Sequence, residues 1–158
     1  MNLKIYESLE FSEVKSAFAS YLRTVEGHKI LANLKPMTQQ KEIQQAFDQL
    51  RDIEILGTAG YSLPMPSLGD LTPSLKRLQL EAELNLDDFQ DIKALLRASQ
   101  VLKDFYLDLE DVSLPHLAVY FENLETFPQF QGALQAIADN GTIEDFASED
   151  LLRIRRRL

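Results

Sequence analysis

The chain has 158 residues, 45% of them hydrophobic, with a formal net charge of -9 and no cysteine. This length is typical of one domain with an apolar core of its own, and the lack of cysteine excludes disulfides, zinc-cysteine sites and thiol catalysis. No stretch approaches the roughly 18 apolar residues that a membrane span needs, and the first residues lack the hydrophobic segment of a signal peptide. We therefore expect a cytoplasmic protein with no membrane partner that forms a single domain over residues 1–158.

Helical periodicity dominates the first third of the chain. Apolar residues recur three and four positions apart after Ser12, which is placed to cap a first helix. Thr24 is placed to cap a second, short helix that Pro36 ends. Thr38 is placed to open a third helix, and Gly57 to stop it. The sequence thus predicts three helices before residue 57.

The longest apolar stripe lies in the middle of the chain, after a loop. The segment 57–70 holds three glycines and two prolines, and we interpret it as an excursion within the domain because the amphipathic helices on both sides need partners. A short helix is predicted at 71–80. Asn85 is placed to cap the next helix, with acidic residues in its first turn. One face then continues over about six turns: Phe89, Ile92, Leu96, Ser99, Leu102, Tyr106 and Leu109.

The last third is predicted to hold shorter helices at 114–125 and 129–138, followed by a turn at "DNGTI". The flanks of this turn favour at most a short β-ribbon near 139–147. Ser148 is placed to cap a final helix. The predicted fold class is therefore all-α, a multi-helix bundle.

The final helix has a start but no end signal. No Gly, Asn or Pro follows its arginines, and Leu158 continues the apolar stripe of Leu151 and Ile154. We therefore expect residues 148–158 to be the start of a long helix that is truncated in this chain.

Candidates for catalysis and metal binding are weak. The sequence holds no phosphate-binding loop and no Gly-x-Ser-x-Gly elbow. His28 and His116 are its two histidines; we interpret His28 as a surface or packing residue. Asp108 and Asp111 with His116 are weighed as a metal site, but a solvated acidic helix end is favoured. Three acids near the start of the long helix are interpreted as dipole-compensating residues on a solvated face: Asp87, Asp88 and Asp91.

Four arginines near the end of the chain are its one charge anomaly: Arg153, Arg155, Arg156 and Arg157. The other 12 of the 16 basic residues lie in residues 1–152 together with all 25 acidic residues, so that this part has a net charge of -13. Such a surface repels phosphate backbones, so these arginines are the candidates for nucleic-acid contact. The alternative, which the sequence favours, is a set of surface salt bridges to the domain's own acids.

Motifs along the chain resemble, in order and spacing, the N-terminal region of the MutS-two family, bacterial MutS relatives that lack the mismatch-reading domain. The opening segment carries one set of matches: Leu9, Glu10, Phe11, Tyr21, Thr24, Gly27, Leu34, Pro36 and Ile43. "LNLDDFQDIKALLRASQVLKDF" looks like the next helix of that family. "GTIEDFASEDLLRIRRRL" is similar to the segment where MutS proteins leave the core and begin the lever helices, with matches at Gly141, Asp145, Ala147, Ser148, Leu151, Ile154 and Arg155.

The resemblance implies a non-catalytic core-and-lever module of a larger protein. In that family a MutS-type domain binds and hydrolyses ATP with Mg, and a C-terminal Smr domain cleaves nucleic acid. Family members dimerise, bind branched DNA, restrain recombination in a role related to DNA repair, and in some cases split stalled ribosomes. Neither the Walker motifs nor the Smr motif occurs in this chain, so the resemblance places no catalytic residue, cofactor or metal ligand here.

The implied partners are the remaining domains of the parent chain and, through that parent, DNA or ribosomes. Two other hypotheses stay open at this point. One is a stand-alone helical adaptor that binds a protein partner through an apolar groove. The weaker one is a small enzyme that uses His116 or an acidic pair, since the chain shows no nucleophile, cofactor loop or ligand cluster.

Overall fold

The computed structural model describes residues 10–156, and within them every regular element is helical. The predicted all-α, multi-helix class is confirmed. By its contacts the chain divides into two compact units, Met1–Asp70 with Val112–Leu117, and Leu71–Asp111 with Ala118–Leu158. Compactness alone does not decide whether a unit folds by itself, so the single domain over residues 1–158 stays a prediction. No described helix is both long and apolar enough to cross a membrane.

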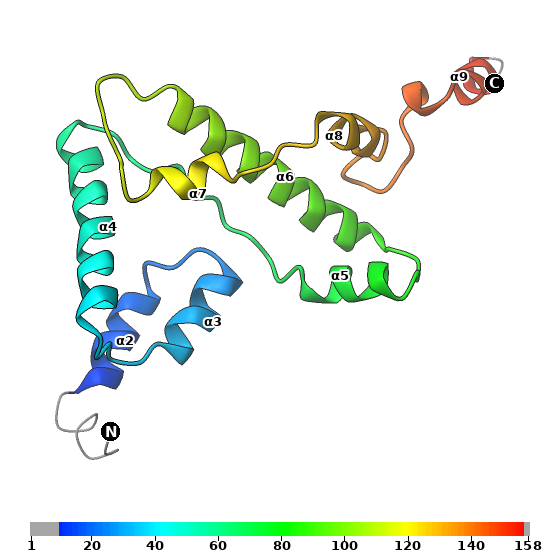
Figure 1. Cartoon of the computed structure of the whole chain (residues 1–158). Coiled ribbons are helices and arrows are strands. Elements are labelled where there is room, and N and C mark those ends of the chain that lie inside the picture. Colours follow the sequence, from blue (N-terminus) through cyan, green and yellow to red (C-terminus); the bar gives the residue numbers. More distant parts are fainter. Residues whose placement is uncertain (1–9, 157–158) are drawn as a thin grey trace. The chain divides into compact units, whose positions relative to one another are not determined.

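The described part of the first unit contains three helices (Figure 1): α2 (Phe11–Ala19), α3 (Val25–Asn33) and α4 (Gln40–Thr58). The predicted cap at Thr24 is confirmed, because its hydroxyl accepts the N–H of Gly27 at 3.0 Å. A Cβ atom at Gly27 would lie 2.9 Å from that hydroxyl oxygen, so a residue without one lets the cap close. The predicted cap at Ser12 is wrong, because Glu10 in a left-handed conformation precedes α2 and Ser12 lies in its first turn.

The boundaries of α4 also differ from those predicted. The helix begins at Gln40, after Thr38, and it continues past Gly57 to Thr58. The left-handed turn then falls at Gly60, where φ is 83°. Glycine adopts this conformation without the steric cost that a Cβ brings, so the chain leaves the helix three residues later than Gly57 suggested.

The glycine-rich segment after α4 returns to the start of α3. The N–H of Val25 donates to the carbonyl of Leu68, and the N–H of Leu68 donates to that of Arg23, both at 3.3 Å. The ammonium of Lys29 lies 3.1 Å from the carboxylate of Asp70. The segment therefore packs against the first unit, whose boundary follows it at Asp70, and its interpretation as an excursion within a single domain stays a prediction.

A buried carboxylate links two segments of the first unit that are far apart in the sequence. Asp52 on α4 is 1% exposed, and its Oδ2 accepts the backbone N–H groups of His116 at 2.7 Å and Leu117 at 2.8 Å. These amides belong to a segment that follows α4 by more than 50 residues in the sequence. Leu56, one turn further along α4, and Leu114 in that segment are also buried. Asp52 thus holds residues 112–117 in the first unit.

The second unit is organised around its longest helix, α6. Its elements are α5 (Thr72–Gln79), α6 (Leu86–Leu107), α7 (Ala118–Glu122), α8 (Pro128–Gln135), the 3-10 turn η1 (Asp145–Ala147) and α9 (Glu149–Arg155). Both α7 and α8 contact α6 (Figure 1). Ile92 and Leu96 of α6 form a buried core cluster with Leu134 of α8. Partly buried apolar residues surround this cluster: Leu71, Leu84, Phe89 and Ile137.

The start of α6 is fixed by a network around Asp88. The predicted cap at Asn85 is confirmed: its side chain accepts the N–H of Asp88, and Asp88 Oδ2 accepts the N–H of Asn85, each at 2.9 Å. Asp88 Oδ1 also accepts from the hydroxyl of Ser74 and from Nη1 of Arg77, both at 2.6 Å. The interpretation of Asp88 as a solvated acid is wrong, since these donors from α5 let it be buried, with 4% of it exposed.

Polar side chains along α6 hold the segments around it. Ser99 and Lys103 donate to the carbonyls of Glu125 and Leu124, both at 2.8 Å, between α7 and α8. Tyr106 stacks on Phe121 of α7 with ring centroids 4.9 Å apart and an interplanar angle of 2°. The second half of α6 is therefore linked to the chain that leads into α8.

The predicted β-ribbon near 139–147 is reduced to one antiparallel bridge between Ile137 and Ile143. Gly141 at the turn has a φ of 82°, and a Cβ there would lie 3.0 Å from Cδ2 of Leu86. Gln90 donates to the carbonyl of Asp139 at 2.6 Å, and Lys93 donates to that of Ile137 at 2.7 Å. The turn therefore rests on the first half of α6, and its own ladder is short: the N–H of Ala138 donates to the carbonyl of Thr142, and the N–H of Glu144 donates to that of Ala136, both at 2.8 Å.

We predict that replacing Asp52 by alanine lowers the free energy of unfolding by about 3 kcal/mol, because two backbone N–H groups lose their charged acceptor. Urea denaturation of the purified chain measures this. The control is Asp48→Ala one turn earlier on α4, whose ion pair with Arg51 is long, at 3.9 Å, and which is expected to cost less than about 1 kcal/mol. Equal losses in the two variants would contradict the assigned role of Asp52.

We also predict an acid-labile contribution from Asp88. The hydroxyl of Ser74, the N–H of Asn85 and the charge of Arg77 hold the pKa of the Asp88 carboxyl below its ordinary value of 3.8. A depressed pKa stabilises the fold above the unfolded-state pKa, and this contribution is lost as the pH falls below about 4 towards the folded-state pKa. The stability difference between wild type and Asp88→Asn should therefore shrink over that acid range in urea titrations.

The matched control is Asp87→Asn, because Asp87 lies next to Asp88 in the same first turn and is exposed. Its stability difference from wild type should change less over the same acid range. A difference for Asp88→Asn that stays constant from about pH 6 to pH 2 would contradict the proposed linkage.

Candidate nucleic-acid interface

Two arginines of the predicted cluster, Arg153 and Arg155, lie on α9, whose start is well defined. The hydroxyl of Ser148 accepts the N–H of Leu151 at 3.1 Å, which confirms the predicted cap. Glu149 and Asp150 occupy the first turn, where carboxylates compensate the positive end of the helix dipole. The helix packs against η1 just before it in the sequence. The local sequence therefore accounts for how α9 begins.

Two of the arginines pair with acids of the same segment. Arg153 Nη2 lies 2.8 Å from Asp150 Oδ1, and Arg155 Nη1 lies 2.5 Å from Asp145 Oδ1. Arg156 is exposed and forms no ion pair within residues 10–156. Arg157 and Leu158 lie outside the described residues. The salt-bridge alternative thus describes Arg153 and Arg155, and the role of all four arginines in nucleic-acid contact stays a prediction.

The charge around α9 is balanced rather than basic. Residues 144–150 contain four acids, Glu144, Asp145, Glu149 and Asp150, which equal in number the four arginines of residues 153–157. Surface ion pairs of this kind contribute little free energy, about 0–1 kcal/mol each, so a competing phosphate can displace them. The isolated segment therefore offers an anion contact that acids of its own chain oppose.

The other residues considered from the sequence do not form a reactive group. His28 is exposed, and its Nδ1 lies 2.9 Å from the carbonyl oxygen of Thr24 in the preceding turn of α3. His116 is exposed, and its backbone N–H is bound by Asp52. Within residues 10–156 no three His, Asp or Glu side chains come together as a possible metal site. Asp108 and Asp111 belong to the second unit, whereas His116 belongs to the first.

Two residues that hold other segments of the chain in place were not predicted from the sequence. Asp88 carried a local signal, because a capping box pairs a cap residue with an acceptor three positions later. Asp52 carried no such signal, because its partners lie 64 and 65 residues away. The sequence shows only that Asp52 is an acid next to the apolar face of the helix predicted before Gly57.

Comparison with known proteins shows which sequences the chain is similar to. No known family profile matches the chain. The chain is 44% identical over all of its 158 residues to Endonuclease MutS2 of Streptococcus agalactiae serotype Ia and to that of Streptococcus pyogenes serotype M5. It is 43% identical over the same length to Endonuclease MutS2 of Streptococcus sanguinis. In each case the alignment covers 100% of this chain and 20% of the relative.

The chain therefore spans about a fifth of the length of the curated relatives that it matches. An identity of 43–44% without loss of coverage confirms the resemblance drawn from the spaced motifs. The chain is thus homologous along its whole length to one part of the MutS-two family of proteins.

Proposed function

We propose that this chain is a non-catalytic helical core-and-lever module of a larger, cytoplasmic MutS-two-type protein that handles nucleic acid. The observation that carries the proposal is the similarity of the entire chain to one fifth of proteins named Endonuclease MutS2. ATP and Mg binding, nuclease activity and dimerisation belong to the remainder of such a parent, as the family resemblance implies. DNA, in repair or recombination, or the ribosome is then reached through that parent.

The geometry of the second unit supports a mechanical role. The turn that leads into α9 rests on α6 through Gln90 and Lys93, and α6 in turn holds the segment before α8. A displacement of α9 would therefore act on a turn that α6 holds at two points. In this proposal, α9 begins the lever and α6 is the part of the body that receives its movement.

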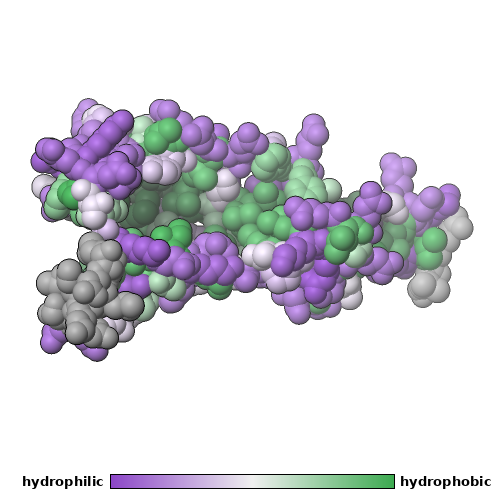
Figure 2. Space-filling model, turned by 60° about the horizontal axis from the view of Figure 1, so that its bottom comes forward, coloured by the Kyte–Doolittle hydropathy of each residue, from purple (hydrophilic) through white to green (hydrophobic). Residues whose placement is uncertain are grey.

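The adaptor hypothesis has one observation in its favour, which is exposed apolar surface. On the face drawn in Figure 2, hydrophobic residues lie open between polar ones. On α4, Phe47 is 61% exposed and Leu50 is 57% exposed. Such surface suits a partner protein, but it equally suits the remaining four fifths of a parent chain, so it does not displace the first proposal.

We predict that a helix break in α9 uncouples ATP from nucleic-acid binding in the full-length protein. Arg153→Pro removes a helical N–H and costs about 3 kcal/mol of helix stability, whereas Arg153→Ala removes the same side chain and keeps the helix. ATP should change the DNA affinity of wild type and Arg153→Ala but not that of Arg153→Pro, with basal ATP hydrolysis within about twofold in all three. Fluorescence anisotropy with and without ATP measures the affinity.

Two outcomes would count against the lever. The first is full ATP dependence of DNA affinity in Arg153→Pro. The second is the same loss of ATP dependence in Arg153→Ala, which would assign the effect to the guanidinium rather than to the helix. A full-length protein that binds a partner protein but shows no ATP-dependent nucleic-acid affinity would favour the adaptor.

We further predict that the 158-residue chain alone binds duplex DNA weakly. A net charge of -13 over residues 1–152 opposes binding, and few phosphates are neutralised by four arginines with four acids beside them. Any binding at about 50 mM salt should vanish near 150 mM salt in fluorescence anisotropy, because an affinity that is already weak falls further with each counterion that the arginines release. Sub-micromolar affinity that persists at the higher salt would show that the charge argument is wrong.

A further inference from the structure

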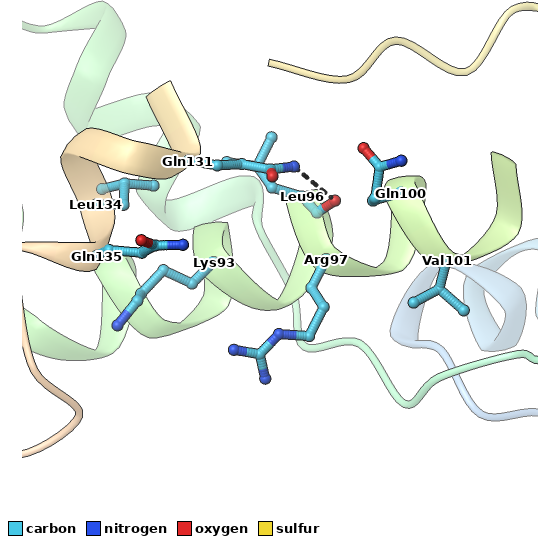
Figure 3. Close-up of a pocket in the computed structure, with 8 residues that line it drawn as sticks. All are labelled: Lys93, Leu96, Arg97, Gln100, Val101, Gln131, Leu134 and Gln135. Atoms are coloured by element: carbon cyan, nitrogen blue, oxygen red, sulfur yellow. Dashed lines mark hydrogen bonds between the residues drawn. The ribbon is translucent and has the colours of Figure 1, made fainter. Parts of the chain in front are cut away.

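A pocket lies between α6 and α8 within the second unit (Figure 3). Its apolar lining comes from Leu96 and Val101 of α6 and Leu134 of α8, and Leu96 and Leu134 are buried. Its volume is about 160 Å³. Pockets for small molecules and cofactors are usually of roughly 300–1,000 Å³, whereas a cavity of about 150 Å³ accepts one benzene ring. The pocket therefore fits a single large apolar side chain.

The polar residues around the pocket divide into two groups, of which the first is held in place. Lys93 donates to the carbonyl of Ile137 at 2.7 Å, and Gln100 donates to Asp104 at 2.7 Å. Gln131 of α8 donates to the carbonyl of Leu96 at 3.3 Å (Figure 3). These bonds hold three of the lining side chains in place, which lowers the entropy cost of binding.

The second group is available to a partner. Arg97 is exposed and forms no ion pair in the part of the chain that the structure describes, and Gln135 is exposed without a hydrogen bond from its side chain there. Figure 3 shows Arg97 projecting from α6 on the same side as Lys93, with Gln135 reaching over from α8. A guanidinium recognises carboxylates through paired N–H donors, and an amide adds one more donor.

We propose that this pocket is a docking site for a protein segment that presents one large apolar side chain, such as Phe, directly beside an Asp or Glu carboxylate. The apolar side chain fills the space above Leu96 and Leu134, and the carboxylate binds Arg97. The small volume selects a side chain over a cofactor, and the exposed guanidinium of Arg97, which has no ion pair among residues 10–156, favours a carboxylate beside that side chain. A phosphate group would use Arg97 but leave the apolar lining without a partner.

Blocked dipeptides test this by NMR titration of the 158-residue chain. N-acetyl-Asp-Phe-amide is expected to shift the amide signals of residues 93–101 and 131–135 saturably at millimolar concentration. N-acetyl-Asn-Phe-amide, which keeps the ring and removes the charge, should bind about fivefold more weakly. N-acetyl-Asp-Ala-amide and inorganic phosphate should cause no saturable shift in these residues.

Variants separate the two halves of the site. Arg97→Gln should abolish the difference between the Asp-Phe and Asn-Phe peptides and leave the weaker affinity unchanged. The control Arg51→Gln changes an exposed arginine of α4 in the same way and should preserve the fivefold difference. Val101→Phe fills the pocket from a position that is 42% exposed and should abolish binding of both peptides without opening a cavity in the core.

Four results would overturn the proposal. They are no saturation by the Asp-Phe peptide up to about 20 mM, equal affinity of the Asp-Phe and Asn-Phe peptides for wild type, saturable phosphate binding at Arg97 that matches the peptide, and unchanged binding in Val101→Phe. Phosphate binding would point instead to contact with a nucleic-acid backbone. The inference concerns the second unit only and does not depend on the proposed lever function.

Discussion

The carboxylate of Asp88 is the interaction on which the second unit depends. It receives hydrogen bonds from the hydroxyl of Ser74, the guanidinium of Arg77 and the N–H of Asn85, so that one side chain joins α5 to the first turn of α6. A buried carboxylate is tolerated only when such donors surround it, and within residues 10–156 no buried side-chain nitrogen or oxygen lacks a partner. These bonds fix the first turn of α6 against α5, and the direction of the rest of the helix follows from that turn. Its side chains can then bind backbone carbonyls at four places: Leu124, Glu125, Ile137 and Asp139.

The first unit uses the same chemistry with a different partner. Asp52 accepts two backbone N–H groups from a distant segment, whereas Asp88 accepts mainly from neighbouring helices. Two carboxylates of this acidic chain are thus buried, where they accept hydrogen bonds from donors that apolar side chains cannot bind. The fully buried apolar side chains are few, so these polar contacts specify which segments meet. The pocket between α6 and α8 is a product of this arrangement, since the side chains that hold its sides are engaged with the backbone.

Local sequence signals predicted the helices well, but they did not predict contacts between residues that are far apart in the sequence. Thr24, Asn85 and Ser148 were placed correctly because a cap depends on residues three positions away. The cap predicted at Ser12 was wrong because residue propensities do not indicate the left-handed conformation of Glu10, which precedes the helix. Arg153 and Arg155 were part of a charge anomaly in the sequence, yet their pairing with Asp150 and Asp145 depends on how this segment folds. The pocket beside Arg97 combines residues of two helices, so no single stretch of the sequence predicts it.

The discontinuous make-up of the first unit has a consequence for how the chain is made. Asp52 leaves the ribosome 64 residues before His116, and all of α5 and α6 are synthesised in between. At roughly 5–20 residues per second, its carboxylate waits on the order of three to thirteen seconds for its partners. During that interval the residues of α2, α3 and α4 are all made, but His116 and Leu117, whose N–H groups bind Asp52, do not yet exist. The amino-terminal unit is therefore begun first and completed only after most of its neighbour has emerged, so the order of the sequence is not the order of assembly.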